Sequence, residues 1–271
     1  MIFLQFDFET HSKDETEQLI ALLSEQGFDG FEEDGDTLIA FIPKRVFDET
    51  EFQKTLARFA ILGYSKTEVE NINWNKKWEE EFEPVVVDKF VGIRAHFHKP
   101  IKNVKHEIII TPKMSFGTGH HATTYMMIQQ MKALDFTGKK VFDFGTGTGV
   151  LAILAEKLGA MEVMAIDKDE WSITNATENC QMNNCHTIAI KQMDTIPKGK
   201  QYDIILANIN LNVIMASLAS LKAAAAPAAK FILSGFLKTD EPLLTKALGK
   251  AGLKKISTIK RGNWVAVSGE K

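Results

Sequence analysis

From residue 121 onward, short apolar runs alternate with longer stretches in which hydrophobic residues recur at helical spacing. Short apolar runs predict buried strands, and a period of about 3.6 residues predicts a helix with one buried face. These patterns predict strands over residues 140–144, 161–166, 187–192, 203–208, 229–234, 254–260 and 263–268. They predict helices from residue 121 and over residues 150–158, 170–183, 211–225 and 239–251. Strands that alternate with helices favour a parallel sheet covered on both faces.

The last two predicted strands are joined only by Arg261, Gly262 and Asn263. A parallel neighbour requires a crossover of a dozen or more residues, so the last strand must be antiparallel. A mostly parallel sheet with an antiparallel last strand is typical of the Rossmann-like fold of class I methyltransferases and differs from a plain dehydrogenase sheet. The predicted fold class is therefore α/β.

Residues 1–72 follow a different order of elements. The pattern predicts strands over residues 2–8, 28–33, 37–42 and 64–72, and helices over residues 14–26 and 48–62. Each helix has one apolar face to bury. The resulting βαββαβ order is the ferredoxin-like α+β arrangement. Modules of this kind usually recognise a partner, so we expect a substrate-recognition domain over residues 1–72.

Residues 73–90 are strongly charged and contain Trp74, Trp78 and Phe82. They predict a linker whose aromatic side chains pack on one or both domains, with a substrate-binding surface as the alternative. Strands predicted at 91–95 and 106–111 open a second domain, which spans residues 91–271.

Composition narrows the class of protein. The chain has 271 residues, 45% of them hydrophobic and 25% charged, as in an ordinary globular protein of about two domains. A net charge of −3 does not favour dedicated nucleic-acid binding, although a local basic patch stays open. Neither a basic leader nor an uninterrupted apolar run of about eighteen residues is present, which predicts a cytoplasmic protein. Cys180 and Cys185 lack partners at metal-binding spacing, so no metal site is expected.

Residues 141–149 read Val-Phe-Asp-Phe-Gly-Thr-Gly-Thr-Gly and predict a strand that runs into a glycine turn. Gly145 and Gly147 would let a ligand approach the main chain closely. Gly147, Gly149 and Ala152 also satisfy the dinucleotide-binding pattern, and a turn without any ligand is a further alternative. Asp143, inside the strand, favours S-adenosylmethionine, because an acidic residue there holds the loop or the amino group of the methionine moiety.

Two further strand ends carry suitable polar groups. Asp167 follows the strand at 161–166 and would accept hydrogen bonds from both ribose hydroxyls, since Asp169 is better placed to cap the next helix. Asn208 ends the strand at 203–208. Its side-chain oxygen and a neighbouring backbone carbonyl would hold the hydrogens of a neutral amine, with the nitrogen lone pair aimed at the methyl group. The alternative is that Asn208 is a polar residue in a turn, with no role in binding.

The segment 115–124 reads Ser-Phe-Gly-Thr-Gly-His-His-Ala-Thr-Thr. Its glycines predict a loop able to close over a ligand, and Thr124 offers a hydroxyl near the start of a helix. Side chains of the adjacent His120 and His121 diverge, so we expect structural or capping roles rather than metal binding.

The chain resembles the bacterial methyltransferases of ribosomal protein L-eleven (L11) over nearly its whole length. The most specific element is Phe116-Gly-Thr-Gly-His-x-x-Thr-Thr124. It is followed, in the family's order, by the glycine turn, Asp167, Asn208-Ile209 and Asn263-Trp264-Val265.

The resemblance implies trimethylation of lysine side chains and of the N-terminal amine of L11, on or off the ribosome, with the N-terminal module recognising the target. It places Thr124, Gly145, Asp167 and Asn208 on the family's cofactor contacts and Phe116 in the loop that covers the cofactor. A monomer is expected. Asn210 departs from the family, in which leucine is more usual at that position.

Two other functions stay open from the sequence. One is methylation of another protein, an RNA or a small molecule, although the Asn-Pro-Pro-Tyr turn of glutamine-modifying enzymes is absent. The other is a non-catalytic binding module of the ribosome, against which the intact glycines, Asp167 and Asn208 argue.

Overall fold

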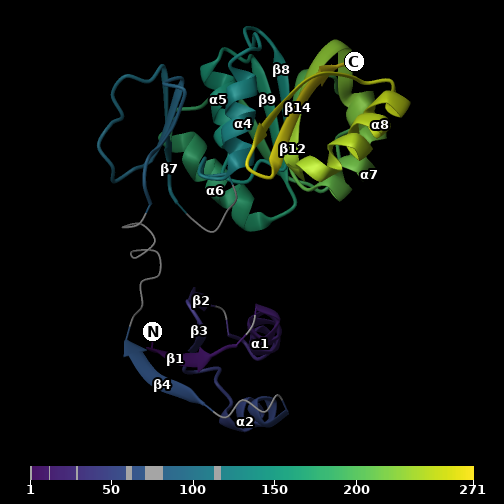
Figure 1. Ribbon diagram of the computed structural model, residues 1–271. Helices are drawn as coiled ribbons and strands as arrows, with labels where there is room; N and C mark the ends of the chain where they lie inside the picture. The colour runs from purple at the N-terminus through teal and green to yellow at the C-terminus, as the bar shows by residue number, and fades with distance from the viewer. Residues whose placement is uncertain (1, 12, 29, 59–62, 71–81, 113–116) are drawn as a thin grey trace. The chain divides into compact units, whose positions relative to one another are not determined.

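The computed structural model describes residues 2–11, 13–28, 30–58, 63–70, 82–112 and 117–271. The chain divides into two compact units, residues 1–77 and 78–271 (Figure 1). Of the predicted linker, residues 73–81, with Trp74 and Trp78, lie outside the described residues.

The N-terminal unit has the predicted βαββαβ order. Its elements are β1 (Ile2–Glu9), α1 (Lys13–Glu25), β2 (Gly30–Asp34), β3 (Thr37–Pro43), α2 (Glu49–Arg58) and β4 (Tyr64–Glu70). The strands form an antiparallel sheet in the order β2-β3-β1-β4. Alternate residues of β1 are buried, and the ring of Phe6 lies 4.6 Å from that of Phe52 in α2. The period-two pattern of β1 therefore builds the core of this unit.

The second unit begins with a small three-stranded sheet that the sequence did not separate from the main one. It consists of β5 (Val85–Val87), β6 (Val91–Ala95) and β7 (His106–Ile110), with β6 parallel to β7 and antiparallel to β5. Phe82 is buried in the adjacent core, so this aromatic residue of the predicted linker packs on the second unit.

The main sheet has seven strands. They are β8 (Lys140–Phe144), β9 (Glu162–Asp167), β10 (Ile188–Gln192), β11 (Tyr202–Asn208), β12 (Ala225–Leu237), β13 (Lys254–Arg261) and β14 (Trp264–Glu270). Their order is β10-β9-β8-β11-β12-β14-β13, and β14 is antiparallel to both of its neighbours. The mostly parallel sheet with an antiparallel last strand is confirmed.

β12 begins earlier than the sequence pattern indicated, at Ala225 rather than at residue 229. Its register against β11 shifts between the pairs Tyr202–Ala225 and Ile204–Lys230. The irregularity coincides with Pro227, which cannot donate to a strand ladder, and with Ala228, whose φ is 59°. The strand therefore passes through a bulge, which interrupts the simple apolar pattern.

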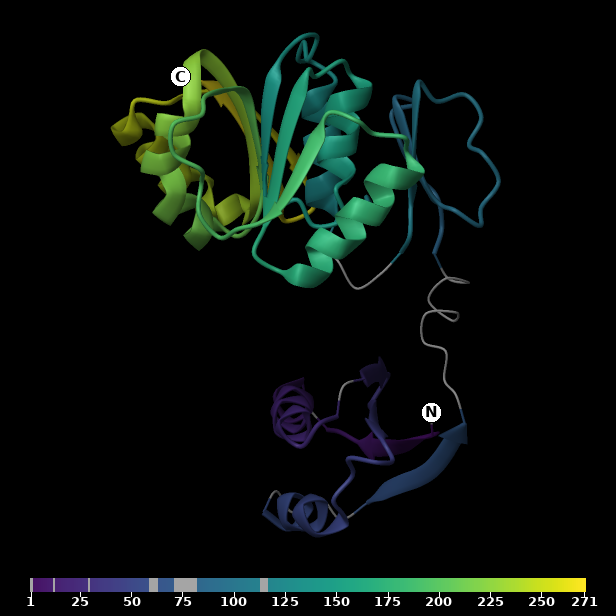
Figure 2. The same ribbon diagram turned by 180° about the vertical axis from the view of Figure 1, so that it is seen from behind.

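Helices cover both faces of the main sheet (Figures 1 and 2). One face carries α4 (Ala122–Met131), α5 (Val150–Lys157) and α6 (Glu170–Met182), and the other carries α7 (Leu211–Ala224) and α8 (Glu241–Ala251), which follows the short helix η1 (Lys238–Asp240). Successive strand residues point to opposite layers. Val141 belongs to the first core and Phe142 to the second, which explains the uninterrupted apolar strands.

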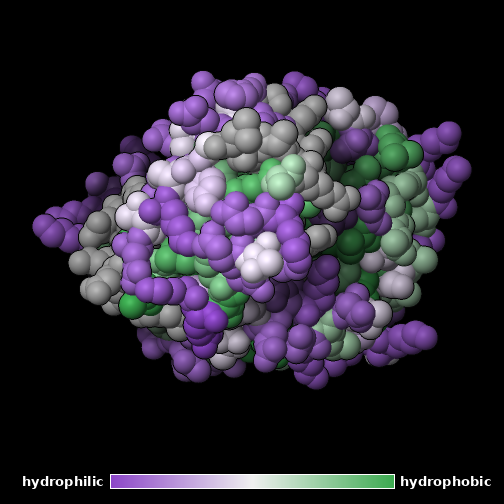
Figure 3. Space-filling model, turned by 90° about the horizontal axis from the view of Figure 1, so that it is seen from below, coloured by the Kyte–Doolittle hydropathy of each residue, from purple (hydrophilic) through white to green (hydrophobic). Residues whose placement is uncertain are grey.

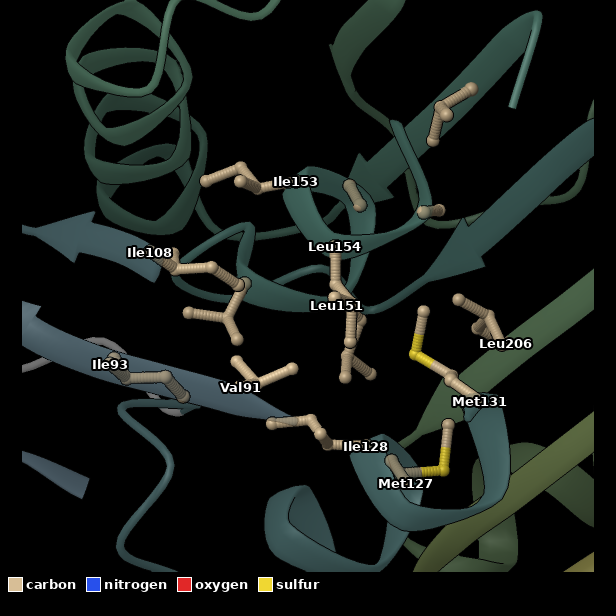
Figure 4. Close-up of a cluster of buried hydrophobic side chains, with 14 of the residues drawn as sticks. Val91, Ile93, Ile108, Met127, Ile128, Met131, Leu151, Ile153, Leu154 and Leu206 are labelled. Carbon is tan, nitrogen blue, oxygen red and sulfur yellow. The ribbon is translucent and has the colours of Figure 1, made fainter. Parts of the chain in front are cut away.

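The first core joins the small sheet to the main one. In Figure 4, side chains from β6 and β7 converge with those of α4, α5 and β11. Ile93, Ile108, Met127 and Leu154 are fully buried there. The small sheet and α4 are thereby fixed against the strands that carry the site.

The surface seen in Figure 3 is mostly hydrophilic, with hydrophobic residues in separate patches. Within the described part of the chain, no helix has the length and apolar character needed to cross a membrane.

Candidate active site at the carboxyl edge of the main sheet

A cavity of about 660 Å³ lies at the carboxyl edge of the main sheet. Its wall follows the order of five adjacent strands: Asp167 at the end of β9, Gly145 just after β8, Asn208 at the end of β11, Gly235 near the end of β12 and Trp264 at the start of β14. Parallel α/β sheets bind their ligands at this edge. The residues predicted from separate strand ends therefore share one cavity.

The glycine turn packs closely against the loop after β11. Gly145 has a φ of 79°, and a Cβ atom there would lie 2.2 Å from Cγ2 of Ile209. Gly149 precedes α5, so the unpaired N–H groups at the start of this helix face the turn. A negatively charged group beside the turn would be favoured by these N–H groups and the helix dipole.

Asp143 lies beneath the turn and is fully buried. Thr146 donates a hydrogen bond from Oγ1 to Oδ2 of Asp143 over 2.7 Å. Burial raises the pKa of Asp143 to about 7, although the hydrogen bond from Thr146 opposes the shift. Of the two roles predicted for this carboxyl, its contact with Thr146 corresponds to holding the loop.

Asp167 lines the cavity and also organises the backbone around it. Its Oδ2 accepts a hydrogen bond from the N–H of Gly147 over 2.9 Å, and its Oδ1 accepts one from the N–H of Asp169 over 3.1 Å. Each carboxylate oxygen has a second lone pair, which leaves acceptor capacity toward the cavity. Asp169 caps α6 by accepting from the N–H of Trp171, as predicted.

Asn208 is almost fully buried at the end of β11. Its Nδ2 donates a hydrogen bond to Oγ1 of Thr124 over 3.1 Å, which joins two residues predicted independently. Its Oδ1 is buried and has no hydrogen-bond partner among the described residues. An unpaired buried acceptor is costly, and a ligand that donates an N–H would satisfy it.

Other candidate residues have local structural roles. Asn210 accepts a hydrogen bond from the N–H of Val213 and caps α7, which gives a physical reason for asparagine at this position. His121 caps α4 by accepting from the N–H of Thr123, as expected for one of the adjacent histidines. His120 lies apart, with its ring 4.7 Å from that of Phe82. Phe116 lies outside the described residues.

The sequence did not assign several residues to the site. Gly235 and Trp264 line the cavity beyond Asn208, and His121 lies beside them. At the opposite end, the loops after β9 and β10 contribute Lys168, Asp169, Met193 and Asp194, and the first turn of α6 contributes Ser172. The sequence signal that could have identified Gly235 as a site residue is its position directly after the predicted strand 229–234. Trp264 joins the site only because β14 inserts beside β12.

The cavity meets the requirements of the predicted cofactor, a nucleoside with an amino-acid tail. Asp167 provides acceptors for a diol at one end, and Gly145 and Gly147 of the glycine turn let a ligand approach the main chain closely. Asn208 supplies an unpaired hydrogen-bond acceptor at the end of β11, near the middle of the main sheet.

The chain is similar in sequence to one family of known proteins. A sequence profile described as "Ribosomal protein L11 methyltransferase (PrmA)" matches residues 9–271. A ribosomal protein L11 methyltransferase from Phocaeicola vulgatus is 37% identical over 276 residues, which cover 98% of each chain. One from Chlorobaculum parvum is 38% identical over 275 residues, covering 97% of this chain and 94% of the relative.

A solved structure is similar as well. The crystal structure of ribosomal protein L11 methylase from Lactobacillus delbrueckii subsp. bulgaricus superposes with a TM-score of 0.65 at 25% identity. The match covers 69% of this chain and 98% of that one.

Proposed function

The chain belongs to the ribosomal protein L11 methyltransferase (PrmA) family, and we propose that it transfers methyl groups from S-adenosylmethionine to amines of ribosomal protein L11. The amines are lysine side chains and the N-terminal α-amine, carried to the trimethyl state. The observation that carries the choice of target is that relatives bearing this name match at 35–38% identity through both units of the chain.

The cofactor is held by groups at neighbouring strand ends. Asp167 accepts hydrogen bonds from the ribose hydroxyls, and the glycine turn with the start of α5 binds the carboxylate of the methionine moiety. Thr124 holds the amide of Asn208 in place. The sulfonium of S-adenosylmethionine supplies a methyl group that is ready for attack by a nitrogen lone pair.

Asn208 orients the target amine. Its buried Oδ1 accepts an N–H of the neutral amine, which directs the nitrogen lone pair toward the methyl group. This positioning is the main contribution that methyl transfer requires of the protein, because the sulfonium is already a good leaving group.

Deprotonation of the amine is assigned to water. A free lysine has a pKa of about 10.4, so the reactive neutral amine is a minor species at neutral pH. His121 lines the cavity, but its Nδ1 is engaged with Thr123, 2.7 Å from the hydroxyl oxygen and 3.3 Å from the backbone nitrogen, so we assign this ring to capping α4. A rate that rises log-linearly with pH supports deprotonation by water, and a plateau with a low apparent pKa contradicts it.

The N-terminal unit is assigned the recognition of L11, and the segment between β4 and β5 is assigned the connection to the catalytic unit. We place the reaction in the cytoplasm. We assign it to a monomer, because the described residues that line the cavity all belong to the second unit of one chain.

The test is transfer of labelled methyl groups from S-adenosylmethionine to ribosomes and to free ribosomal proteins. We expect one labelled band that corresponds to L11, with mass increments that mark trimethylation. Label on another protein or on RNA, or no label with a folded enzyme, overturns the proposed function.

A substitution tests the role of Asn208. We expect Asn208→Ala to lower kcat for the amine about 100-fold while S-adenosylhomocysteine binds within a few-fold of its normal affinity, since an orienting acceptor is lost. The matched control is Asn210→Ser, because serine at position 210 can still cap α7. Unchanged turnover in Asn208→Ala rules out the orienting role.

A further inference from the structure

Trp264 lies at the end of the cavity opposite Asp167. In the strand order, Asn208 of β11 and Gly235 of β12 stand between Asp167 of β9 and Trp264 of β14. If Asp167 holds the ribose and Asn208 the amine, Trp264 borders the space through which the target side chain enters. This inference rests on the proposed methylation of amines.

We propose that Trp264 is a specificity-determining residue whose indole stabilises the methylated ammonium group and thereby controls how many methyl groups are added. A quaternary ammonium ion is attracted to the face of an aromatic ring, and tryptophan has the strongest such attraction. No other tryptophan lines the cavity in the described part of the chain.

The surroundings of Trp264 hold its ring in place. It is the first residue of β14 and pairs with Leu237 of β12 and Arg261 of β13. The ring of His121 meets it edge to face, with centroids 4.6 Å apart and an angle of 72° between the planes. A T-shaped contact covers at most one face of the indole, so the other face is not covered by His121.

A second contact fixes the same turn to α4. The guanidinium carbon of Arg261 lies 3.7 Å from the ring centre of Tyr125, as in a cation–π pair. His121 and Tyr125, at the start of α4, therefore anchor the two ends of the hairpin turn, and Trp264 is a preorganised part of the cavity wall.

The reaction explains why an aromatic wall is useful. In each transfer the nitrogen lone pair forms the new N–C bond while the S–C bond breaks and its electrons remain on sulfur, so the positive charge passes to nitrogen. The first and second products then lose a proton to water, and the third has no proton to lose.

Hydrogen bonding becomes less effective as methylation proceeds. The neutral primary amine has two N–H groups for Oδ1 of Asn208 and a neighbouring carbonyl, whereas the dimethylated amine has none. Attraction between the indole and the developing ammonium needs no N–H. Trp264 therefore contributes most to the third transfer, and Asn208 contributes most to the first.

Direct binding provides the first test. With the enzyme saturated with S-adenosylhomocysteine, calorimetry measures the affinity for Nα-acetyl-Nε-trimethyl-lysine amide and for the unmethylated analogue. We expect Trp264→Leu to weaken binding of the trimethylated probe about tenfold, Trp264→Phe to retain most of the affinity, and the unmethylated probe to be affected less. Equal affinity of the wild type and Trp264→Leu for the trimethylated probe overturns the proposal. Unchanged S-adenosylhomocysteine affinity shows that each variant is folded.

Product distribution provides the second test. Mass spectrometry of L11 should show that Trp264→Leu slows the third transfer about tenfold more than the first, so that the dimethylated form accumulates. Equal slowing of all transfers indicates a merely structural residue and overturns the proposal. If the wild type does not methylate L11 at all, the proposed function fails, while the binding experiment still decides the role of Trp264.

Discussion

At the scale of single residues, the site depends on polar groups that the fold leaves ready for a ligand. Asn208 has a buried oxygen without a partner, and Asp167 keeps acceptor capacity after binding two backbone N–H groups. The carboxyl group of Asp143 is buried, and its pKa is far above that of an ordinary aspartate. Each of these features leads to a measurable consequence.

Asp167→Ala should lower the affinity for S-adenosylmethionine by about 2–4 kcal/mol, because two charge-assisted hydrogen bonds to the ribose are lost. Isothermal titration calorimetry measures the change. Asp135→Ala removes an aspartate of the same unit that does not line the cavity and serves as the matched control. Affinity equal to that of the wild type in Asp167→Ala would remove the ribose assignment.

Asp143 should make the folded state less stable as pH rises. Its pKa is near 3.9 in the unfolded chain and about 7 in the folded protein, so between these values the folded state binds the additional proton. Its contribution to the free energy of unfolding therefore declines by a few kcal/mol from about pH 4 to about pH 7 and is constant above that range.

The pH dependence is measured by urea denaturation of the wild type and of Asp143→Asn, which has no titrating carboxyl. The difference between the two curves isolates Asp143 from His106 and His121, whose lowered pKa values act in the opposite direction over part of this range. A difference that does not vary between pH 4 and pH 7 contradicts the raised pKa.

At the scale of elements, the cavity exists because strand ends and glycine turns approach one another closely. Gly235 continues β12 beside the loop that follows Asn208, and its φ is 99°. A Cβ atom at this position would lie 2.3 Å from the carbonyl oxygen of Ile209. The loop that follows Asn208 and the end of β12 therefore cannot be separated without changing the site.

Gly235→Ala should destabilise the protein by at least about 2 kcal/mol, since both a left-handed backbone conformation and a backbone clash oppose the side chain. Chemical denaturation measures the loss. Gly199→Ala is the matched control, because Gly199 has a φ of 82° but no atom within 4 Å of the added Cβ. We expect about 1 kcal/mol there. Equal losses in the two variants would show that the contact with Ile209 does not matter.

At the scale of the whole molecule, charge is distributed unevenly between the two units. Residues 1–70 contain sixteen acidic residues against six lysines and arginines, whereas the whole chain carries only −3. An acidic unit attracts a basic target over distances comparable with the Debye length. This asymmetry supports the assignment of the N-terminal unit to recognition of a lysine-rich substrate.

Salt should therefore weaken recognition of L11 without slowing the chemical step. Between about 50 mM and about 500 mM salt we expect KM for L11 to rise several-fold while kcat changes little, because screening acts on the encounter of charged surfaces. Steady-state methylation assays measure both constants, with S-adenosylmethionine saturating throughout. A KM that is independent of salt would show that recognition does not depend on this charge.

Local patterns in the sequence determined most of the elements. In β1 apolar and polar residues alternate, because only one face of its sheet is buried. The strands of the main sheet are continuously apolar, because both faces are buried. Both patterns can be recognised within a short stretch of sequence. Asp167 and Asn208 could be identified in the same way, because each is a polar residue at the end of an apolar run.

Only the tertiary structure decided which elements are neighbours. The insertion of β14 between β12 and β13, the separate sheet of β5–β7, and the meeting of Thr124 with Asn208 join residues far apart in the chain. Gly235 and Trp264 entered the site through the same long-range pairing. Side-chain periodicity specifies which face of an element is buried, whereas the partner of that face depends on hydrogen bonding and packing between distant segments.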